Sequence, residues 1–347
     1  MQSTMKCVIK EAPGEGNLLL TERPLPEMGP NDILVKIHAL AVCGTDVHIK
    51  NWTEFASTRM VPPMIIGHEF SGEVVAKGDL VTQINIGDAV SAETHIVCNT
   101  CDVCHNGNQH VCPNTKVIGL SRDGALAEYI AIPAVNAVVF TKFANWEELS
   151  LMEPFVAAVH AATEFNVAGK TVAVIGCGPI GAMGVAVAKH CGASRVIALE
   201  PVAARGKTAL EMGADVLIDP IKEDVSVAVP AANDGQAVDI VLDFSGNVGA
   251  IASCLSYLKP EGKIAALGLS SKKLSFQLDE FVYRGITLKG IAGRRMYQDW
   301  ETAKGLLARG LDLSPIITHK LPMAEFEEGL RLMAAGECCK CILLPEK

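Results

Sequence analysis

An uncharged run from Thr171 to Ala188 constrains the fold of this 347-residue chain more than any other segment. The run, TVAVIGCGPIGAMGVAVA, is long and apolar enough to suggest a transmembrane helix. Its interior glycines and proline would break such a helix in the middle. The same residues suit a buried strand over Thr171 to Ile175, a tight turn, and a helix over Ile180 to Cys191 that ends at Gly192. The run therefore predicts a strand–turn–helix unit and no membrane span.

The turn carries the pattern G-x-G-x-x-G, which is typical of a dinucleotide-binding site when it joins a strand to a helix. Gly176 permits the turn, Gly178 lets the backbone approach a pyrophosphate, and Gly181 lets the helix pack close to the strand. Pro179 and Ile180 stand where the helix begins, and a helix N-terminus faces the phosphates in such sites. These five residues are candidates for cofactor binding.

Glu200 follows the next predicted strand, Arg195 to Leu199, and lies 19 residues beyond Gly181. An acid at this place hydrogen-bonds the ribose hydroxyls of NAD and repels the 2′-phosphate of NADP, which favours NAD. Arg205 could instead accept that phosphate, or lie over the adenine ring. Glu200 could also be a solvated acid at the end of an ordinary βαβ unit.

Strands and helices go on alternating as far as Ile291. Six predicted strands make a doubly wound parallel sheet, which we assign to a dinucleotide-binding Rossmann domain over residues 156–294. Residues 1–155 hold short β-rich runs separated by Gly, Pro and Asp, with little helical periodicity before Trp146, and predict a distorted all-β domain. Residues 295–347, with a helix over Ala324 to Ala335 and a strand over Lys340 to Leu344, are predicted to complete that first domain.

Four cysteines gather in the stretch CNTCDVCHNGNQHVC: Cys98, Cys101, Cys104 and Cys112. Four thiolates so close in sequence predict a tetrahedral zinc site that is closed and therefore structural. A disulfide pair and a ferredoxin-like iron–sulfur cluster are the alternatives. The bacterial cluster spacing ends in C-x3-C-P, whereas the last gap here has seven residues. The chemistry must then be sought at a second, incomplete site.

Three separate stretches of the β-rich half offer ligands for that site. Cys43, His68 and Glu153 supply a thiolate, an imidazole and a carboxylate, the mixed set expected of a catalytic zinc that keeps one position open. Taken singly, Cys43 could be a core residue, His68 a buried histidine, and Glu153 a charge at a helix N-terminus.

Composition excludes several classes of function. The formal net charge of −9, without a basic block, argues against nucleic acid or an anionic membrane as a partner. With 49% apolar and 20% charged residues the chain is a packed globular protein. The first ten residues lack the apolar core of a signal peptide, and the cysteines outside the four-cysteine stretch are scattered in apolar runs. Both observations indicate a cytoplasmic protein with reduced thiols.

The motif C-G-T-D-x-H at residues 43–48, G-H-E at 67–69, the four-cysteine lobe and G-x-G-x-x-G together resemble the zinc-dependent medium-chain alcohol dehydrogenases over essentially the whole chain. The resemblance implies a GroES-like catalytic domain with a structural zinc lobe at about residues 93–115, beside the Rossmann domain. It implies a catalytic zinc held by Cys43, His68 and Glu153, with Glu69 as an exchangeable ligand or a supporting acid. It further implies a homotetramer built on edge-strand pairing near Thr287 to Ile291.

Thr45 and His48 match the proton relay of this family, and the resemblance implies that they carry the hydroxyl proton of the substrate to solvent. The segments NWTEFAS, PNTKVIG and GRRMYQDW are more narrowly similar to the L-threonine dehydrogenases within the family. That likeness implies a small-molecule alcohol substrate, L-threonine, which NAD oxidises to 2-amino-3-oxobutanoate. His95 and Arg294 are candidate substrate-binding residues, although His95 could simply pack under the lobe and Arg294 could brace a subunit contact.

Two departures from the family pattern leave the substrate open. The family commonly follows the third ligand with Gly-Asn, where this chain has Val156 and Ala157, and a Trp of the family is Phe55 here. A polyol or 2,3-butanediol dehydrogenase is therefore the alternative reading. A non-enzymatic protein that binds NAD and zinc is a third hypothesis, which the presence of every ligand and relay residue disfavours.

Overall fold

The computed structural model describes residues 3–345. The contacts within the chain divide it into two units, residues 1–153 with 317–347 (unit 1) and residues 154–316 (unit 2). The sequence predicts a return to the first unit at residue 295, whereas the structure places the return at residue 317. Residues 295–316 stay with unit 2 because the short 3₁₀ helix at Ser314–Ile316 contacts the helices at Pro179–His190 and Ala203–Glu211.

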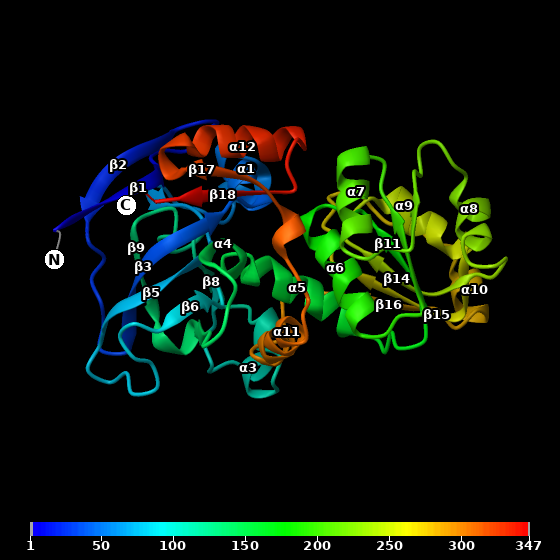
Figure 1. Cartoon of the computed structure of the whole chain (residues 1–347), viewed down its shortest axis with the longest axis horizontal. Coiled ribbons are helices and arrows are strands. Elements are labelled where there is room, and N and C mark those ends of the chain that lie inside the picture. Colours follow the sequence, from blue (N-terminus) through cyan, green and yellow to red (C-terminus); the bar gives the residue numbers. More distant parts are fainter. Residues whose placement is uncertain (1–2, 346–347) are drawn as a thin grey trace. The chain divides into compact units, whose positions relative to one another are not determined.

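Unit 2 is built on a six-stranded sheet, all of whose pairs are parallel, in the order β13-β12-β11-β14-β15-β16 (Figure 1). This is the 3-2-1-4-5-6 order of a doubly wound dinucleotide-binding fold, so the predicted fold class is confirmed. Its elements are α5 (Met152–Thr163, which begins in unit 1), β11 (Thr171–Ile175), α6 (Pro179–His190), β12 (Arg195–Leu199), α7 (Ala203–Glu211), β13 (Val216–Ile218), α8 (Val225–Ala231), β14 (Val238–Asp243), α9 (Val248–Ser253), η3 (Cys254–Ser256), β15 (Leu258–Ala266), α10 (Leu278–Tyr283), β16 (Thr287–Gly290), α11 (Gln298–Ala308) and η4 (Ser314–Ile316).

The uncharged run divides as predicted, into β11 and α6. Every residue of β11 is buried, since the strand is flanked by β12 and β14 in the middle of the sheet. Helices α8 and α10 are absent from our sequence-based expectations, because α8 buries only Val229 and α10 buries no residue, so neither shows an apolar stripe. Within residues 3–345 no helix is both long enough and apolar enough to cross a membrane.

Unit 1 is centred on the ten-residue strand β3, which pairs antiparallel with β5, β9 and β18. The strands of its largest sheet run in the order β10-β6-β5-β3-β18-β17, with β9 on β3 (Figure 1). Because β18 lies against β3, the last strand of the chain is part of the same core as the first strands.

The strands of unit 1 are β1 (Thr4–Lys10), β2 (Leu18–Pro24), β3 (Asp32–Ala41), β4 (Met64–Ile65), β5 (Glu69–Lys77), β6 (Ala89–Ala92), β7 (His95–Ile96), β8 (Lys116–Val117), β9 (Tyr129–Pro133), β10 (Ala137–Val139), β17 (Ile317–Pro322) and β18 (Lys340–Leu344). Its helices are α1 (Gly44–Lys50), α2 (Glu54–Ser57), α3 (Asp102–His105), η1 (Gln109–Val111), η2 (Ala134–Asn136), α4 (Trp146–Leu149), η5 (Met323–Glu325) and α12 (Phe326–Ala335).

Helix α1 lies in a region where the sequence shows little helical periodicity. Its seven residues span only about two turns, too few for an apolar stripe to be visible. The helix is fixed instead by its first turn, where the Cys43 side chain accepts from the backbone N–H of Thr45 and the Asp46 carboxylate accepts from the N–H of Cys43. Cys43 therefore begins a helix whose first turns carry the chemistry described below.

Candidate metal centres and cofactor site

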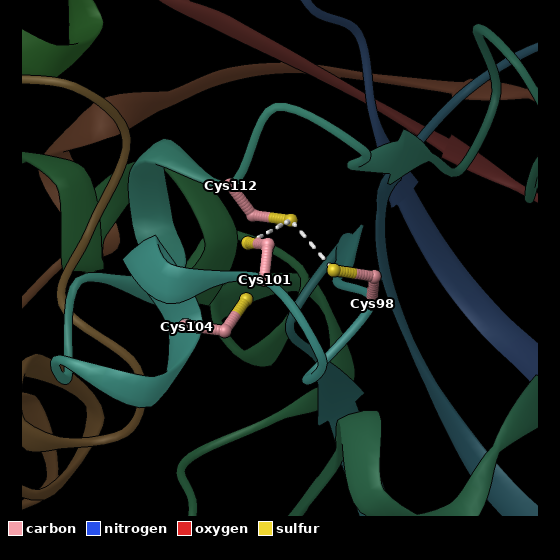
Figure 2. Close-up of side chains that lie close together, drawn as sticks. All are labelled: Cys98, Cys101, Cys104 and Cys112. Atoms are coloured by element: carbon pink, nitrogen blue, oxygen red, sulfur yellow. Dashed lines mark hydrogen bonds between the residues drawn. The ribbon is translucent and has the colours of Figure 1, made fainter.

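The four cysteines of the predicted zinc lobe point their sulfur atoms toward one another (Figure 2). Cys98 precedes α3, Cys101 caps it, Cys104 lies within it, and Cys112 follows η1. Their Sγ atoms all lie within 4.8 Å of one another. The short helices α3 and η1 therefore bend this segment so that its four cysteine side chains meet.

The spacing of these sulfurs fits a tetrahedral metal. Sγ of Cys112 lies 3.5 Å from that of Cys98 and 3.9 Å from that of Cys101, whereas Zn–S bonds of about 2.3 Å in a tetrahedron put sulfurs about 3.8 Å apart. A disulfide would need about 2.05 Å, and all four thiols are unpaired. Hydrogen bonds from Thr100 lower the pKa of the Cys98 thiol to about 5, which favours its thiolate, whereas burial and the neighbouring thiols raise the pKa of Cys104 to about 12.

A second cluster in unit 1 brings together Cys43, His68 and Glu69, whose candidate ligand atoms all lie within 4.8 Å of one another. Cys43 caps α1, His68 stands just before β5, and Glu69 is the first residue of that strand. His68 and Glu69 are buried, and Cys43 is partly so. A thiolate, an imidazole and a carboxylate in this arrangement suit a zinc ion with a fourth position open.

Glu153 does not belong to this cluster, which differs from the ligand set that the family resemblance implies. It lies at the beginning of α5, is 8% exposed, and its Oε1 accepts a hydrogen bond from Thr94 Oγ1 at 3.1 Å. Its charge still acts on Cys43 and on Glu69, so it lies near the cluster. The carboxylate placed with Cys43 and His68 is that of Glu69.

Lys340 is a functional candidate that the sequence analysis missed. Its Nζ donates to both carboxylate oxygens of Glu69 and, at 3.0 Å, to the carbonyl of Val42 beside Cys43. Lys340 is 3% exposed and Glu69 is 1% exposed. Burial raises the pKa of Glu69, and Lys340 opposes that rise. Burial alone would lower the pKa of Lys340, but the attraction of Glu69 and Cys43 outweighs it and holds that pKa above its usual value.

Two buried polar atoms lack a hydrogen-bond partner among residues 3–345: Nδ1 of His68, a member of the cluster, and Oδ1 of Asp46 on α1. Burial raises the pKa of Asp46, and the charge of His68 opposes that rise. A buried polar atom without a partner is costly. These atoms therefore fit a site in which a bound group such as a metal ion supplies the partner that the polypeptide does not.

Thr45 and His48 both lie on α1, three residues apart, and thus on one face of the helix. His48 Nδ1 is 3.2 Å from Thr53 Oγ1, and the His48 ring lies 5.6 Å from that of Phe55. Helix α1, which the sequence did not predict, explains the spacing of Thr45 and His48, because residues three apart lie on the same face of a helix.

The glycine pattern in unit 2 has the geometry expected of it. Gly176 has φ of +80°, the left-handed conformation that a side chain disfavours. A Cβ on Gly181 would stand 2.0 Å from the carbonyl oxygen of Gly176, so only glycine lets α6 come this close to β11. Gly178 caps α6, Pro179 and Ile180 open it, and a Cβ on Gly178 would meet no atom within 4 Å.

Gly176 and Gly178 line a cavity of about 700 Å³ at the carboxyl ends of β11 and β12, together with Glu200, Arg205 and Asn247. Both oxygens of the Glu200 carboxylate are engaged, since Oε2 accepts from the N–H of Cys177 at 2.7 Å and Oε1 from that of Val202 at 2.9 Å. The Glu200 carboxylate therefore links the glycine turn after β11 to the segment that follows β12. Nε of Arg205 has no partner among the residues that the structure describes.

The two candidate substrate residues are placed differently. His95 lies in β7 of unit 1, where its Nδ1 is 3.0 Å from Oε1 of Glu93. Arg294, in unit 2, is 2% exposed, and its guanidinium lies 6.0 Å from the ring centre of Trp300. Val156 and Ala157 are both buried in α5.

Two family models match the chain: an alcohol dehydrogenase GroES-like domain over residues 29–142, and a zinc-binding dehydrogenase domain over residues 179–309. Proteins named L-threonine 3-dehydrogenase are similar over the full length. One from Caldanaerobacter subterraneus subsp. tengcongensis is 45% identical, covering 99% of this chain and 100% of its own. One from Bacillus subtilis is 42% identical, covering 99% of this chain and 100% of its own.

Solved structures of dehydrogenases are also similar to this chain over nearly its full length. A putative zinc-binding dehydrogenase from Sinorhizobium meliloti bound to NADP has a TM-score of 0.92 at 29% identity, covering 99% of this chain and 100% of that one. The 2R,3R-butanediol dehydrogenase of Bacillus subtilis has a TM-score of 0.89 at 25% identity, with the same coverage. The resemblance inferred from the sequence motifs is therefore confirmed.

Proposed function

The chain belongs to the zinc-dependent medium-chain alcohol dehydrogenase family, and from that premise we propose that it oxidises L-threonine with NAD. The C3–H bond would break with transfer of a hydride to the nicotinamide, and the hydroxyl would lose its proton, giving 2-amino-3-oxobutanoate, NADH and a proton. The observation that carries the proposal is the cluster of Cys43, His68 and Glu69 in a chain whose relatives with 45% and 42% identity bear this name.

We assign one zinc to each cluster. The four-cysteine lobe has all its ligands from protein and is structural, whereas Cys43, His68 and a carboxylate leave one position for the substrate oxygen. Zinc bound there supplies Lewis-acid polarisation of the alcohol, and NAD supplies the hydride acceptor. Glu69 is the carboxylate that stands with the other two ligands, and Glu153 is the one that could exchange with it.

The proton would leave through α1. Thr45 Oγ1 accepts the hydroxyl proton of the substrate and passes its own to His48, on the same helical face. Thr53 Oγ1 holds Nδ1 of His48 and so fixes the plane of the imidazole. The route needs no further titratable residue because His48 exchanges protons with solvent.

NAD is the cofactor that Glu200 favours. Its carboxylate lies in the cavity beside the glycine turn, where an acid accepts from ribose hydroxyls and repels a 2′-phosphate. A solved structure of the same fold is bound to NADP, so the fold by itself does not select NAD. The choice between them therefore depends on Glu200 and Arg205.

The variant Glu200→Ala should raise the KM for NAD about tenfold, or about 1.4 kcal/mol. The substitution removes the acceptor for the ribose and also releases the N–H groups of Cys177 and Val202, which loosens the turn. Steady-state kinetics with NAD and NADP at saturating alcohol check this. The ratio of the two KM values should move toward NADP, and an unaltered ratio would remove the ribose role of Glu200.

The alternative substrate is a neutral diol, which the likeness to a 2R,3R-butanediol dehydrogenase keeps in view. That likeness, at 25% identity, is weaker than the 45% identity to an L-threonine 3-dehydrogenase. Val156 and Ala157 bury apolar groups where the family commonly has an amide, so any contact from that amide is lost in this chain.

L-threonine should give a higher kcat/KM than sorbitol or 2,3-butanediol in assays of NADH formation run side by side. Activity should fall on slow chelation and return with zinc, because Cys43 and His68 do not polarise the alcohol by themselves. A diol that exceeds L-threonine by tenfold, about 1.4 kcal/mol of transition-state preference, would replace the threonine assignment by the diol one.

We further propose a cytoplasmic homotetramer. All twelve cysteines lie within residues 3–345, where none forms a disulfide, and free thiols suit a reducing compartment. The edge strand β16 has all four residues exposed, and Leu278, Val282 and Tyr283 of the preceding helix α10 are exposed as well. An exposed edge strand that follows a helix with exposed apolar side chains supports pairing with a second copy of the chain.

A further inference from the structure

Lys10 is a fully buried lysine at the end of β1, with 0% exposure, and nothing in the reaction proposed above uses it. Its Nζ donates to the carbonyl oxygen of Gly14 and, at 2.5 Å, to that of Gly16, both in the loop that follows β1. The same Nζ lies over the ring of Trp52, 4.9 Å from its centre. Carbonyl oxygens and the face of an indole are groups that attract a cation, so these contacts suit the charged ammonium.

The loop that Lys10 holds closes the C-terminal end of helix α1. The last residue of that helix is Lys50, whose carbonyl accepts from the N–H of Gly16 at 2.8 Å. The carbonyls of residues 47–49 accept from the N–H groups of residues 51–53. The last carbonyls of a helix have no partner further along the helix and must be satisfied by other groups. Gly16, and the Lys10 ammonium that holds it, therefore complete the last turn of α1.

Trp52, two residues beyond the end of α1, has a left-handed backbone with φ of +50°. Many helices end in this conformation, but the residue there is usually glycine, because a side chain disfavours it. Such a conformation persists where the surroundings hold it in place. The Trp52 ring packs against the hydrophobic core of unit 1, and the Lys10 ammonium lies over its face. Lys10 therefore helps to hold a strained turn.

This turn leads directly into the residues that contact His48. The N–H of Thr53 donates to the carbonyl of His48 at 3.1 Å, and Oγ1 of Thr53 is 3.2 Å from the ring Nδ1. His48 itself is exposed, so the surrounding core does little to fix its ring. Cys43 begins α1 at the metal cluster, and Lys10 holds the other end of the helix. The position of His48 therefore depends on both ends of α1.

We propose that Lys10 is a positioning residue of the proton relay, whose ammonium fixes the C-terminal end of α1 and the turn at Trp52 and so keeps His48 in reach of Thr45. The inference rests on the proposed function and deepens it by naming what holds the solvent end of the relay. Lys10 acts through the main chain of Gly16 and the ring of Trp52.

The test compares wild type, Lys10→Met, His48→Gln and the double variant Lys10→Met/His48→Gln as zinc-loaded enzymes. Lys10→Met removes the charge at nearly constant length, and should lower the rate of NADH formation in a single turnover about tenfold. The KM for NAD should stay within about twofold of wild type, because the cofactor cavity lies in unit 2. In the His48→Gln background, where the relay is already interrupted, Lys10→Met should change the rate by less than about twofold.

Lys50→Met is the matched control. Lys50 is also a lysine at the C-terminal end of α1, but only its main-chain carbonyl contacts the loop. If the loss of any positive charge near this helix end were the cause, Lys50→Met would slow the reaction as Lys10→Met does. The single-turnover rate of Lys50→Met should instead stay within about twofold of wild type.

A second readout does not depend on turnover. Hydrogen exchange of residues 49–55, followed by mass spectrometry, should be at least about tenfold faster in Lys10→Met than in wild type and unchanged in Lys50→Met. Exchange of β3 and β5 should be unchanged in both, which shows that the effect is local. Should Lys10→Met not fold, Trp52→Leu decides the matter, because it removes the ring and leaves the lysine and its loop in place. It should show the same slow turnover and fast exchange.

Full additivity of Lys10→Met and His48→Gln, unchanged exchange of residues 49–55, or equal losses in Lys10→Met and Lys50→Met would each overturn the inference. A wild-type rate in His48→Gln would overturn the relay in the proposed function, whereas the exchange rates would still decide whether Lys10 holds the end of α1. Failure to oxidise L-threonine would overturn only the substrate, since the same rates can be measured with any alcohol that the enzyme oxidises.

Discussion

Cys43→Ser should reduce kcat/KM by at least about a thousandfold, or about 4 kcal/mol of transition-state stabilisation. The Cys43 thiolate belongs to the cluster with His68 and Glu69 and also begins helix α1, so its loss should remove the proposed zinc from beside the proposed relay of Thr45 and His48. The serine hydroxyl can still cap α1, so the fold should survive. Metal analysis of the purified variant should show the loss of one zinc, with the zinc of the four-cysteine lobe retained.

Cys191→Ser is the matched control, since Cys191 is a partly buried cysteine of unit 2 that belongs to neither metal cluster. It should keep wild-type activity and both zinc ions. Wild-type activity in Cys43→Ser with one zinc missing would instead move the chemistry away from this cluster.

Lys340→Met should lower the free energy of opening of the central strands of unit 1 by about 3–5 kcal/mol. In zinc-free protein, where no metal ion compensates the charge, the substitution leaves the Glu69 carboxylate, 1% exposed, without its lysine partner. Methionine is close to lysine in length, so little packing is lost. Hydrogen exchange of β3, β5 and β18 measures the effect, because these strands carry the pair or lie between its members.

The double variant Lys340→Met/Glu69→Gln separates charge from packing. Removing the uncompensated charge should restore most of the lost stability, because an amide is far cheaper to bury than a carboxylate. A decrease below about 1 kcal/mol in Lys340→Met would mean that water reaches Glu69 and that the ion pair is not a structural element.

Much of the nucleotide-binding unit could be predicted from the sequence because its elements are specified locally. Strand β11 and helix α6 are encoded by an apolar run broken by glycines, and β12 has the predicted bounds. Helices α1, α8 and α10 escaped prediction because they are short and bury few residues. Their stability comes from caps and from contacts made elsewhere in the fold.

The metal ligands likewise fall into a set that is specified locally in the sequence and a set that depends on the tertiary fold. The four-cysteine lobe is local, so its geometry follows from spacing along 15 residues of chain. In the second cluster, the third ligand expected from the family resemblance was Glu153, yet the structure places Glu69 with Cys43 and His68. Glu69 and Glu153 are both carboxylates, and the sequence does not show that the buried Lys340 ammonium holds Glu69 beside Cys43. A lone lysine in the apolar run CCKCILL was the one available signal.

The sequence by itself therefore determined the fold class, the glycine turn for the dinucleotide and the four-cysteine site, because each depends on residues close together in the chain. Only the tertiary structure decided that Lys340 holds Glu69 across 271 residues and that Asn136 donates to the backbone carbonyl of His95 while Glu93 contacts its imidazole. Those contacts arise when β18 docks on β3 and when the turn after β6 closes on η2. Such pairings are set by packing of the whole core, which no local spacing encodes.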